Sequence, residues 1–263
     1  MDGKPPLFQA DGISFRHPGK PVVADLSLRL DAGRFYGLLG PNGCGKTTLI
    51  DLLAGMKSPD AGRIRYKGKA LSGLTRKALA KEIALVPQDF YINFPFTARE
   101  VVLMGRYPYM RRFSPPSLED VQVVQDILAA TAAEGVADRR VTDLSGGEKQ
   151  RVVFARALAQ DTPVLMLDEA TSNLDIRHAI HLLNVTAERV ARLGRTVLAV
   201  FQDINLAAMF CDHLLLMHDG RIVDRGPTAD VLTVDALKAV FGVDSDVRFD
   251  PVCGAVQVSF RRG

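Results

Sequence analysis

The chain has 263 residues, 47% of them hydrophobic and 24% charged, which is enough for one large domain or for a core with inserted subdomains. A formal net charge of +3 is too small to indicate nucleic acid as a partner. The three widely spaced cysteines suit a reducing compartment better than a disulfide framework. No uncharged apolar run approaches the roughly 18 residues of a membrane span, and the N-terminus lacks the apolar core of a signal peptide, so we expect a cytoplasmic protein.

The first predicted elements are short strand-like runs between residues 7 and 39, separated by Gly, Pro and Asp turns, which indicate an antiparallel start. A helix is expected over 46–54 and ends at Gly55. It is followed by a strand at 63–68 and by a short apolar strand at 83–88.

Periodic helices dominate the next part of the chain. Ser117 is a suitable N-cap for a helix over 118–133, which should end near Gly135. One face of this helix should carry an apolar stripe made of Val121, Val124, Leu128 and Ala132.

Strands and helices alternate from residue 163 onward. We expect a buried strand at 163–168, a helix at 175–194, a strand at 195–201 and a hairpin with an Asp-Gly turn at 213–226. This alternation predicts an α/β protein with a mostly parallel sheet, and the helix-rich block at about 90–158 resembles an insertion into it.

A phosphate-binding loop is indicated by GLLGPNGCGKTTL, residues 37–49, between an apolar strand and a helix. Glycines allow backbone N–H groups to surround phosphates, and the helix N-terminus adds a favourable dipole. Lys46 would place its charge on the phosphates, and the Thr47 hydroxyl can ligate Mg²⁺. A chance Gly-rich turn is the alternative, and the flanking strand and helix argue against it. The nucleotide-binding residues expected here are Gly40, Pro41, Asn42, Gly43, Cys44, Gly45, Lys46, Thr47 and Thr48.

Cys44 stands inside this loop at the start of a helix, an environment that lowers the pKa of a thiol. One hypothesis is therefore that alkylation of Cys44 blocks ATP binding and that MgATP protects the thiol. The alternative is that cysteine only fills a small position in the loop.

Two carboxylates follow the apolar strand in PVLMLDEA, residues 163–170. Parallel sheets place their ligand sites at the carboxyl ends of strands. Asp168 would hold Mg²⁺ through water, and Glu169 would orient or deprotonate the attacking water. Such a pair is often only a helix N-cap, but the phosphate loop upstream favours the catalytic interpretation.

A second anion site is indicated by LSGGEKQRVVFARALA, residues 144–159, in which Ser145, Gly146 and Gly147 open a helix. Two phosphate-recognising loops with one complete phosphate site suggest that nucleotide is shared between two copies of the chain. With these motifs the chain resembles the ATP-binding subunits of ABC transporters over nearly its whole length. The resemblance implies an α/β fold with a RecA-like P-loop core, an N-terminal antiparallel β subdomain and an inserted α-helical subdomain.

The resemblance also implies roles for individual residues. In that family, Ser145 and Gly147 of one subunit contact the γ-phosphate held by the other, so that ATP joins a head-to-tail dimer. Gln88 matches the Q-loop glutamine, which touches Mg²⁺ and the attacking water, and Asp175 lies in the D-loop that crosses the dimer interface. The implied parts are a nucleotide-binding core at 1–88 and 159–225, a helical subdomain at 89–158 and a C-terminal extension at 226–263.

Two positions depart from the family pattern. The aromatic residue that stacks on adenine is replaced by His17, with Phe15 as a competitor that strand alternation should turn into the core. The switch histidine that reads the γ-phosphate is replaced by Gln202, which can donate a hydrogen bond but cannot become cationic. We therefore expect slowed hydrolysis, or else a substitution engineered to trap the ATP-bound dimer.

The segment 95–113 and the C-terminal tail resemble importers of iron–siderophores, haem and vitamin B12. This resemblance implies membrane permease subunits as partners, a substrate-binding protein as an indirect one, and a peripheral position on the cytoplasmic face of the inner membrane. A surface that receives a permease helix could be formed by Arg106, Arg111 and Arg112 beside Tyr107 and Tyr109, and a solvated basic loop is the alternative. Two other classes remain open: a soluble ABC ATPase without transport function, and an ATP-binding regulator with slow or no hydrolysis.

Overall fold

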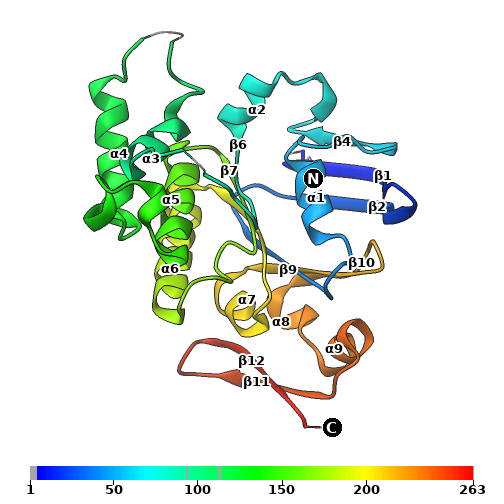
Figure 1. Ribbon diagram of the computed structural model, residues 1–263. Coiled ribbons are helices and arrows are strands. Elements are labelled where there is room, and N and C mark those ends of the chain that lie inside the picture. Colours follow the sequence, from blue (N-terminus) through cyan, green and yellow to red (C-terminus); the bar gives the residue numbers. More distant parts are fainter. Residues whose placement is uncertain (1–4, 93, 112–113, 263) are drawn as a thin grey trace. The chain divides into compact units, whose positions relative to one another are not determined.

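The computed structural model describes residues 5–92, 94–111 and 114–262 (Figure 1). It contains two compact units, one formed by residues 1–74 and 196–263 and the other by residues 75–195. Within the described residues, no helix is both long enough and apolar enough to cross a bilayer.

The first unit begins with an antiparallel sheet, as the sequence predicts. Its strand order is β2-β1-β4-β5. Along β2 the buried residues Leu26, Leu28 and Leu30 alternate with exposed polar residues at positions 25, 27 and 29. The core therefore lies on one side of this sheet. The strands are β1 (Phe8–His17), β2 (Lys20–Leu30), β4 (Ala61–Tyr66) and β5 (Lys69–Ala70).

Parallel strands form the second layer of this unit. β3 lies between β8 and β9, and every residue of β3 and of β8 is buried. β10 pairs antiparallel with β9 through Asp219 and Gly220, whose φ values of 46° and 75° suit the predicted Asp-Gly turn. The elements are β3 (Phe35–Leu39), α1 (Lys46–Leu53), η1 (Leu71–Gly73), β8 (Thr196–Val200), α7 (Ile204–Phe210), β9 (His213–His218) and β10 (Arg221–Pro227).

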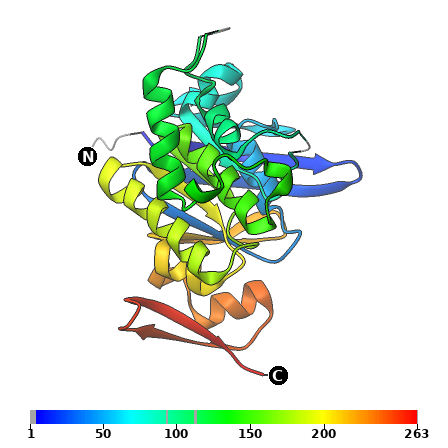
Figure 2. The same ribbon diagram turned by 60° about the vertical axis from the view of Figure 1, so that its left-hand side comes forward.

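The C-terminal extension, for which the sequence predicts no elements, is folded. It contains α8 (Thr228–Val231), α9 (Val234–Phe241) and a hairpin of β11 (Ser245–Asp250) and β12 (Ala255–Phe260). In both views the hairpin lies beside α7 and α9 of the same unit (Figures 1 and 2).

The second unit combines two parallel strands with helices. β6 (Ile83–Val86) pairs with β7 (Val164–Asp168), so their carboxyl ends lie at one edge. The remaining elements are α2 (Arg76–Glu82), α3 (Ala98–Leu103), η2 (Met104–Arg106), α4 (Leu118–Ala130), η3 (Glu134–Val136), η4 (Val141–Asp143), α5 (Gly146–Ala159) and α6 (Ile176–Leu193). The predicted α/β class with an antiparallel N-terminal sheet and an inserted helical region is confirmed.

The predicted stripe of α4 is wrong at both ends. Val121 is 46% exposed, and the helix ends at Ala130, before the exposed Ala132 at φ 53°. The buried face consists of Val124, Ile127 and Leu128, preceded by the buried Asp120. The predicted stripe was wrong at its start because the charged Asp120, rather than Val121, occupies the first buried position of α4.

Candidate active site

The phosphate loop runs from the end of β3 into α1, as predicted. Gly45 is the N-cap of α1 with φ 108°, and the N–H of Leu49 donates to its carbonyl at 2.9 Å. The buried Lys46 folds its ammonium group back over the loop, with Nζ 2.7 Å from the Gly40 oxygen and 3.0 Å from the Pro41 oxygen. The lysine charge therefore lies at the mouth of the loop, beside the N–H groups that begin the helix.

Close packing explains the glycines of the loop. A Cβ at Gly40 would lie 2.1 Å from the backbone oxygen of Met217, and a Cβ at Gly45 would lie 2.6 Å from that of Val22. Thr47 is exposed at the start of α1, so its hydroxyl is accessible to a ligand. Gly40, Gly45, Lys46 and Thr47 thus lie in one loop between β3 and α1, and its binding of phosphate remains a prediction.

Cys44 departs from the expectation of a reactive thiol. Its side chain is buried, and burial raises the pKa of the thiol more than the Lys46 charge lowers it. The prediction of a lowered pKa is therefore wrong, because desolvation outweighs the helix N-terminus at this position.

His17 and Phe15 lie at the end of β1 with their rings in contact. The ring centroids are 5.3 Å apart at an interplanar angle of 86°. His17 is exposed, and Phe15 is half-buried rather than inside the core, which corrects the expectation from strand alternation. Lys57 places Nζ 5.6 Å from the centroid of Phe15. Both rings are thus available to a stacking ligand.

Gln202 is exposed in the loop between β8 and α7. The N–H of Phe201 donates to the Leu38 carbonyl at 3.2 Å, and β8 runs parallel to β3. Gln202 therefore follows its strand at the same edge of the sheet at which Gly40 follows β3, where α/β proteins place ligands.

In the second unit, Gln88 and Glu169 are in direct contact. Gln88 follows β6, Glu169 follows β7, and Gln88 Nε2 donates to Glu169 Oε2 at 2.9 Å. Both Asp168 and Glu169 are buried, and Glu169 has φ 51°, a strained backbone conformation for a residue with a side chain. The structure thus brings together three predicted site residues at one sheet edge.

The second predicted anion site, with Ser145, Gly146 and Gly147, forms an exposed helix N-terminus, and we call it the signature loop. Ser145 is the N-cap of α5 in a capping box: its Oγ accepts from the Glu148 N–H at 3.3 Å, and the Glu148 carboxylate accepts from the Ser145 N–H at 2.8 Å. That backbone hydrogen bond is the main reason for the lowered pKa of Glu148. Within the part of the chain that the structure describes, a Cβ at Gly146 would meet no atom within 4 Å, so this face of the loop is open.

One residue that the sequence analysis missed connects the signature helix to the carboxylate loop. Gln150 is 1% exposed, and its Nε2 donates to the Ala170 carbonyl at 2.7 Å. Ala170 directly follows Glu169. Its place in the sequence, five residues after Ser145, carries no signal of this contact, so the sequence alone could not have singled out Gln150.

Asp175 acts as the N-cap of α6. Its carboxylate accepts from the His178 N–H at 3.0 Å and lies 2.7 Å from His178 Nδ1. The backbone hydrogen bond is the largest cause of its lowered pKa. Its role across an interface remains a prediction from the family resemblance.

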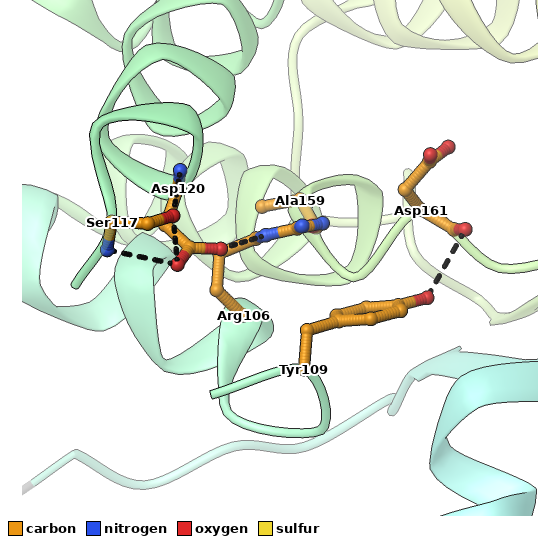
Figure 3. Close-up of polar contacts among 6 residues, drawn as sticks. All are labelled: Arg106, Tyr109, Ser117, Asp120, Ala159 and Asp161. Atoms are coloured by element: carbon orange, nitrogen blue, oxygen red, sulfur yellow. Dashed lines mark hydrogen bonds and ion pairs between the residues drawn. The ribbon is translucent and has the colours of Figure 1, made fainter. Parts of the chain in front are cut away.

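Arg106 is buried, so both expectations for it are wrong: it belongs neither to an exposed surface for a permease helix nor to a solvated basic loop. It is 7% exposed, with Nε 2.9 Å from Asp120 Oδ1 and Nη1 donating to the Ala159 carbonyl at 2.9 Å. Figure 3 shows its guanidinium over the ring of Tyr109, 4.4 Å from the centroid. Arg106 therefore joins η2, α4 and α5 internally.

Aromatic side chains remain exposed around this segment. Arg111 is exposed, and Arg112 lies outside the described residues. The exposed aromatic residues, which we call the aromatic surface, are Tyr91, Phe94, Phe96, Tyr107 and Tyr109. Tyr91, Phe94 and Phe96 follow Gln88 within eight residues, whereas Tyr107 and Tyr109 lie about twenty residues after it.

Comparison with known proteins points to one family. A family model described as "ABC transporter" matches residues 23–172. The chain is 41% identical over 252 residues to the hemin import ATP-binding protein HmuV of Bordetella parapertussis, covering 93% of this chain and 95% of the relative.

Two further matches extend this comparison. The chain is 41% identical over 248 residues to the cobalamin import ATP-binding protein BtuD of Halobacterium salinarum, covering 94% of this chain but only 62% of that relative's length. A solved structure described as a metal-chelate type ABC transporter in an inward-facing conformation superposes with a TM-score of 0.82 at 27% identity, over 98% of both chains. The predicted fold thus agrees with that of solved ABC ATPases.

Proposed function

This chain belongs to the ABC transporter family, and we propose that it is the ATP-hydrolysing subunit of an importer for a metal chelate such as haem, cobalamin or an iron–siderophore complex. One observation carries the import assignment. The chain is 41% identical to a hemin import ATP-binding protein over nearly the whole length of both chains. The names of the relatives differ in their cargo, so the shared chemical class is the metal chelate.

ATP would be bound through the phosphate loop, with Lys46 on the phosphates and His17 or Phe15 against the adenine. The residues that would hold Mg²⁺ are Thr47, Gln88 and Asp168, which offer hydroxyl, amide and carboxylate oxygens of the kind that this ion prefers. When bound, the ion neutralises charge that develops on the phosphate oxygens.

Hydrolysis needs a water molecule held in line with the γ-phosphate. Glu169 is the residue that would orient that water or accept its proton, and the hydrogen bond from Gln88 fixes the direction of its carboxylate. Gln202 would donate its amide N–H to the γ-phosphate. A neutral donor stabilises developing negative charge less than a cation does, so we expect slow but real turnover.

A second copy of the chain would complete the site. The exposed Ser145, with Gly146 and Gly147, would contact the γ-phosphate bound by the other copy, so that ATP joins two chains head to tail. Asp175 would lie at the same interface. The open face of Gly146 supports this role, because no atom of the described residues lies within 4 Å of a Cβ placed there.

Permease subunits would be the membrane partners, and a substrate-binding protein would act through them. The aromatic surface supports this assignment, since exposed aromatic side chains are enriched at protein interfaces. The chain would then lie on the cytoplasmic face of the inner membrane as a peripheral subunit. An ATP-binding regulator is the second candidate, and Gln202 is the observation that favours it.

The test combines phosphate release with co-purification. We expect the purified chain to release phosphate from MgATP and the Lys46→Ala variant to lose this activity. We also expect co-purification with a polytopic membrane protein when the chain is expressed with its neighbouring genes. ATP binding without phosphate release would favour the regulator, and hydrolysis without a membrane partner would favour a soluble ATPase.

A further inference from the structure

The side chain of Asn205 holds the C-terminal hairpin by two hydrogen bonds. Its Nδ2 donates to the Val258 carbonyl at 3.2 Å, and its Oδ1 accepts from the Val258 N–H at 2.8 Å. Asn205 lies in the first turn of α7, whereas Val258 lies in β12, 53 residues later in the chain. One amide group therefore binds both backbone groups of a single strand residue.

These bonds occupy the outer edge of the hairpin. Val258 is paired with Val247 across the β11–β12 ladder and is only 4% exposed. In an antiparallel ladder, residues alternate between those bonded to the partner strand and those whose N–H and C=O point away. Val258 is of the second kind, so Asn205 takes the place of a neighbouring strand at this edge.

Asn205 is also bound from the other side by the loop that carries Gln202. The Asp203 carboxylate accepts from the Asn205 N–H at 2.8 Å and from the Leu206 N–H at 3.1 Å, which makes Asp203 the N-cap of α7. The backbone of Asn205 is thus bonded to the loop that carries Gln202, while its side chain is bonded to β12. Both views show the hairpin beside α7 (Figures 1 and 2).

We propose that Asn205 is a positioning residue for ATP hydrolysis, through which the C-terminal hairpin braces the loop that carries Gln202. The proposal rests on the proposed function, because it assigns Gln202 to the γ-phosphate. A glutamine offers only a neutral hydrogen bond and loses much rotamer freedom when it binds. Its effect on the reaction therefore depends on how firmly its backbone is held.

The first test is kinetic. Asn205→Ala should lower kcat about tenfold and leave the KM for ATP unchanged, because a small displacement of a catalytic group affects the transition state more than nucleotide binding. Met209→Ala, an exposed position on the same helix, is the matched control and should keep the parent rate.

A double-mutant cycle separates positioning from general damage. In a Gln202→Ala background, Asn205→Ala should cost almost nothing further, since the group that it positions is already absent. Equal losses in both backgrounds would overturn the proposal. Val258→Pro removes the N–H that donates to Asn205 without removing a ladder bond, so it should reproduce the kinetic effect of Asn205→Ala.

Amide hydrogen exchange gives a readout that does not depend on turnover. Exchange at residues 201–204 should be faster in Asn205→Ala and in Val258→Pro than in the parent, whereas Met209→Ala should leave it unchanged. Unchanged exchange in both variants would refute the role of Asn205 in holding the loop, even if the parent hydrolyses ATP. If exchange is faster in both variants but the parent does not hydrolyse ATP, the role of Asn205 in holding the loop is supported and the proposed function is rejected, so the two failures are distinguishable.

Discussion

Replacing Gln202 by histidine should raise the rate of ATP hydrolysis. Gln202 is exposed, follows β8, and lies at the sheet edge at which β3 enters the phosphate loop. A protonated histidine at this exposed position can donate a charged hydrogen bond to the γ-phosphate where glutamine donates a neutral one.

The size of the effect follows from that difference in charge. A hydrogen bond with one charged partner is stronger than a neutral one by about 1–2 kcal/mol, which corresponds to roughly a five- to thirtyfold change in rate. The gain should be present at about pH 6 and lost at about pH 8.5, because imidazole loses its proton as the pH rises through its pKa of about 6.5.

The assay is steady-state phosphate release at saturating MgATP, with Gln202→Ala as the control. We expect the order His, Gln, Ala at the lower pH, with the parent between the two variants. If Gln202→His is no faster than the parent at either pH, glutamine already serves this position fully and the reasoning from charge is refuted.

Three further predictions concern binding and stability. Asp120→Ala leaves the buried Arg106 without its carboxylate and should lower the free energy of unfolding by about 3–5 kcal/mol in urea titrations, whereas the exposed Asp126→Ala should change it by less than about 0.5 kcal/mol. Burial raises the pKa of Asp120, but hydrogen bonds from Ser117 and Arg106 lower it by more, so its pKa in the folded state is below the ordinary value. The stability that this pair contributes is therefore present above about pH 4 and is lost as the pH falls through the lowered pKa. Gly40→Ala should lower the melting temperature and abolish ATP binding, both measured by calorimetry, because the added Cβ would collide with the Met217 oxygen. The control Gly146→Ala adds a Cβ that contacts no atom of the described residues within 4 Å, so it should leave the melting temperature unchanged. Iodoacetamide should label Cys44 slowly in the folded chain and rapidly in urea, by mass spectrometry, and rapid labelling of the folded chain would contradict its burial.

Local signals in the sequence predict much of the fold. Ser117 caps α4, Gly194 ends α6 in the left-handed conformation, and the Asp-Gly turn joins β9 to β10, since each depends on a few neighbouring residues. The phosphate loop is equally local, because its glycines, lysine and flanking elements are contiguous.

Contacts between distant residues were not predictable in the same way. The burial of Arg106 depends on Asp120 and on the Ala159 carbonyl, which lie 14 and 53 residues away. The residues next to Arg106 in the sequence do not indicate either partner. The same reason applies to Asn205, whose partner in β12 belongs to a segment for which the sequence predicts no strands. The raised pKa of Cys44 likewise follows from packing that only the fold determines.

We propose that two copies of the chain hydrolyse ATP by sharing each site, and mixing two inactive variants tests this proposal. Lys46→Ala removes the charge on the phosphates, and Ser145→Arg blocks the signature loop, so each variant alone should be inactive. In a head-to-tail dimer of one copy of each, one site retains both Lys46 and Ser145, and an equal mixture should recover about a quarter of the parent rate of phosphate release. Activity of Ser145→Arg alone, or a mixture no more active than the sum of its parts, would contradict the shared site.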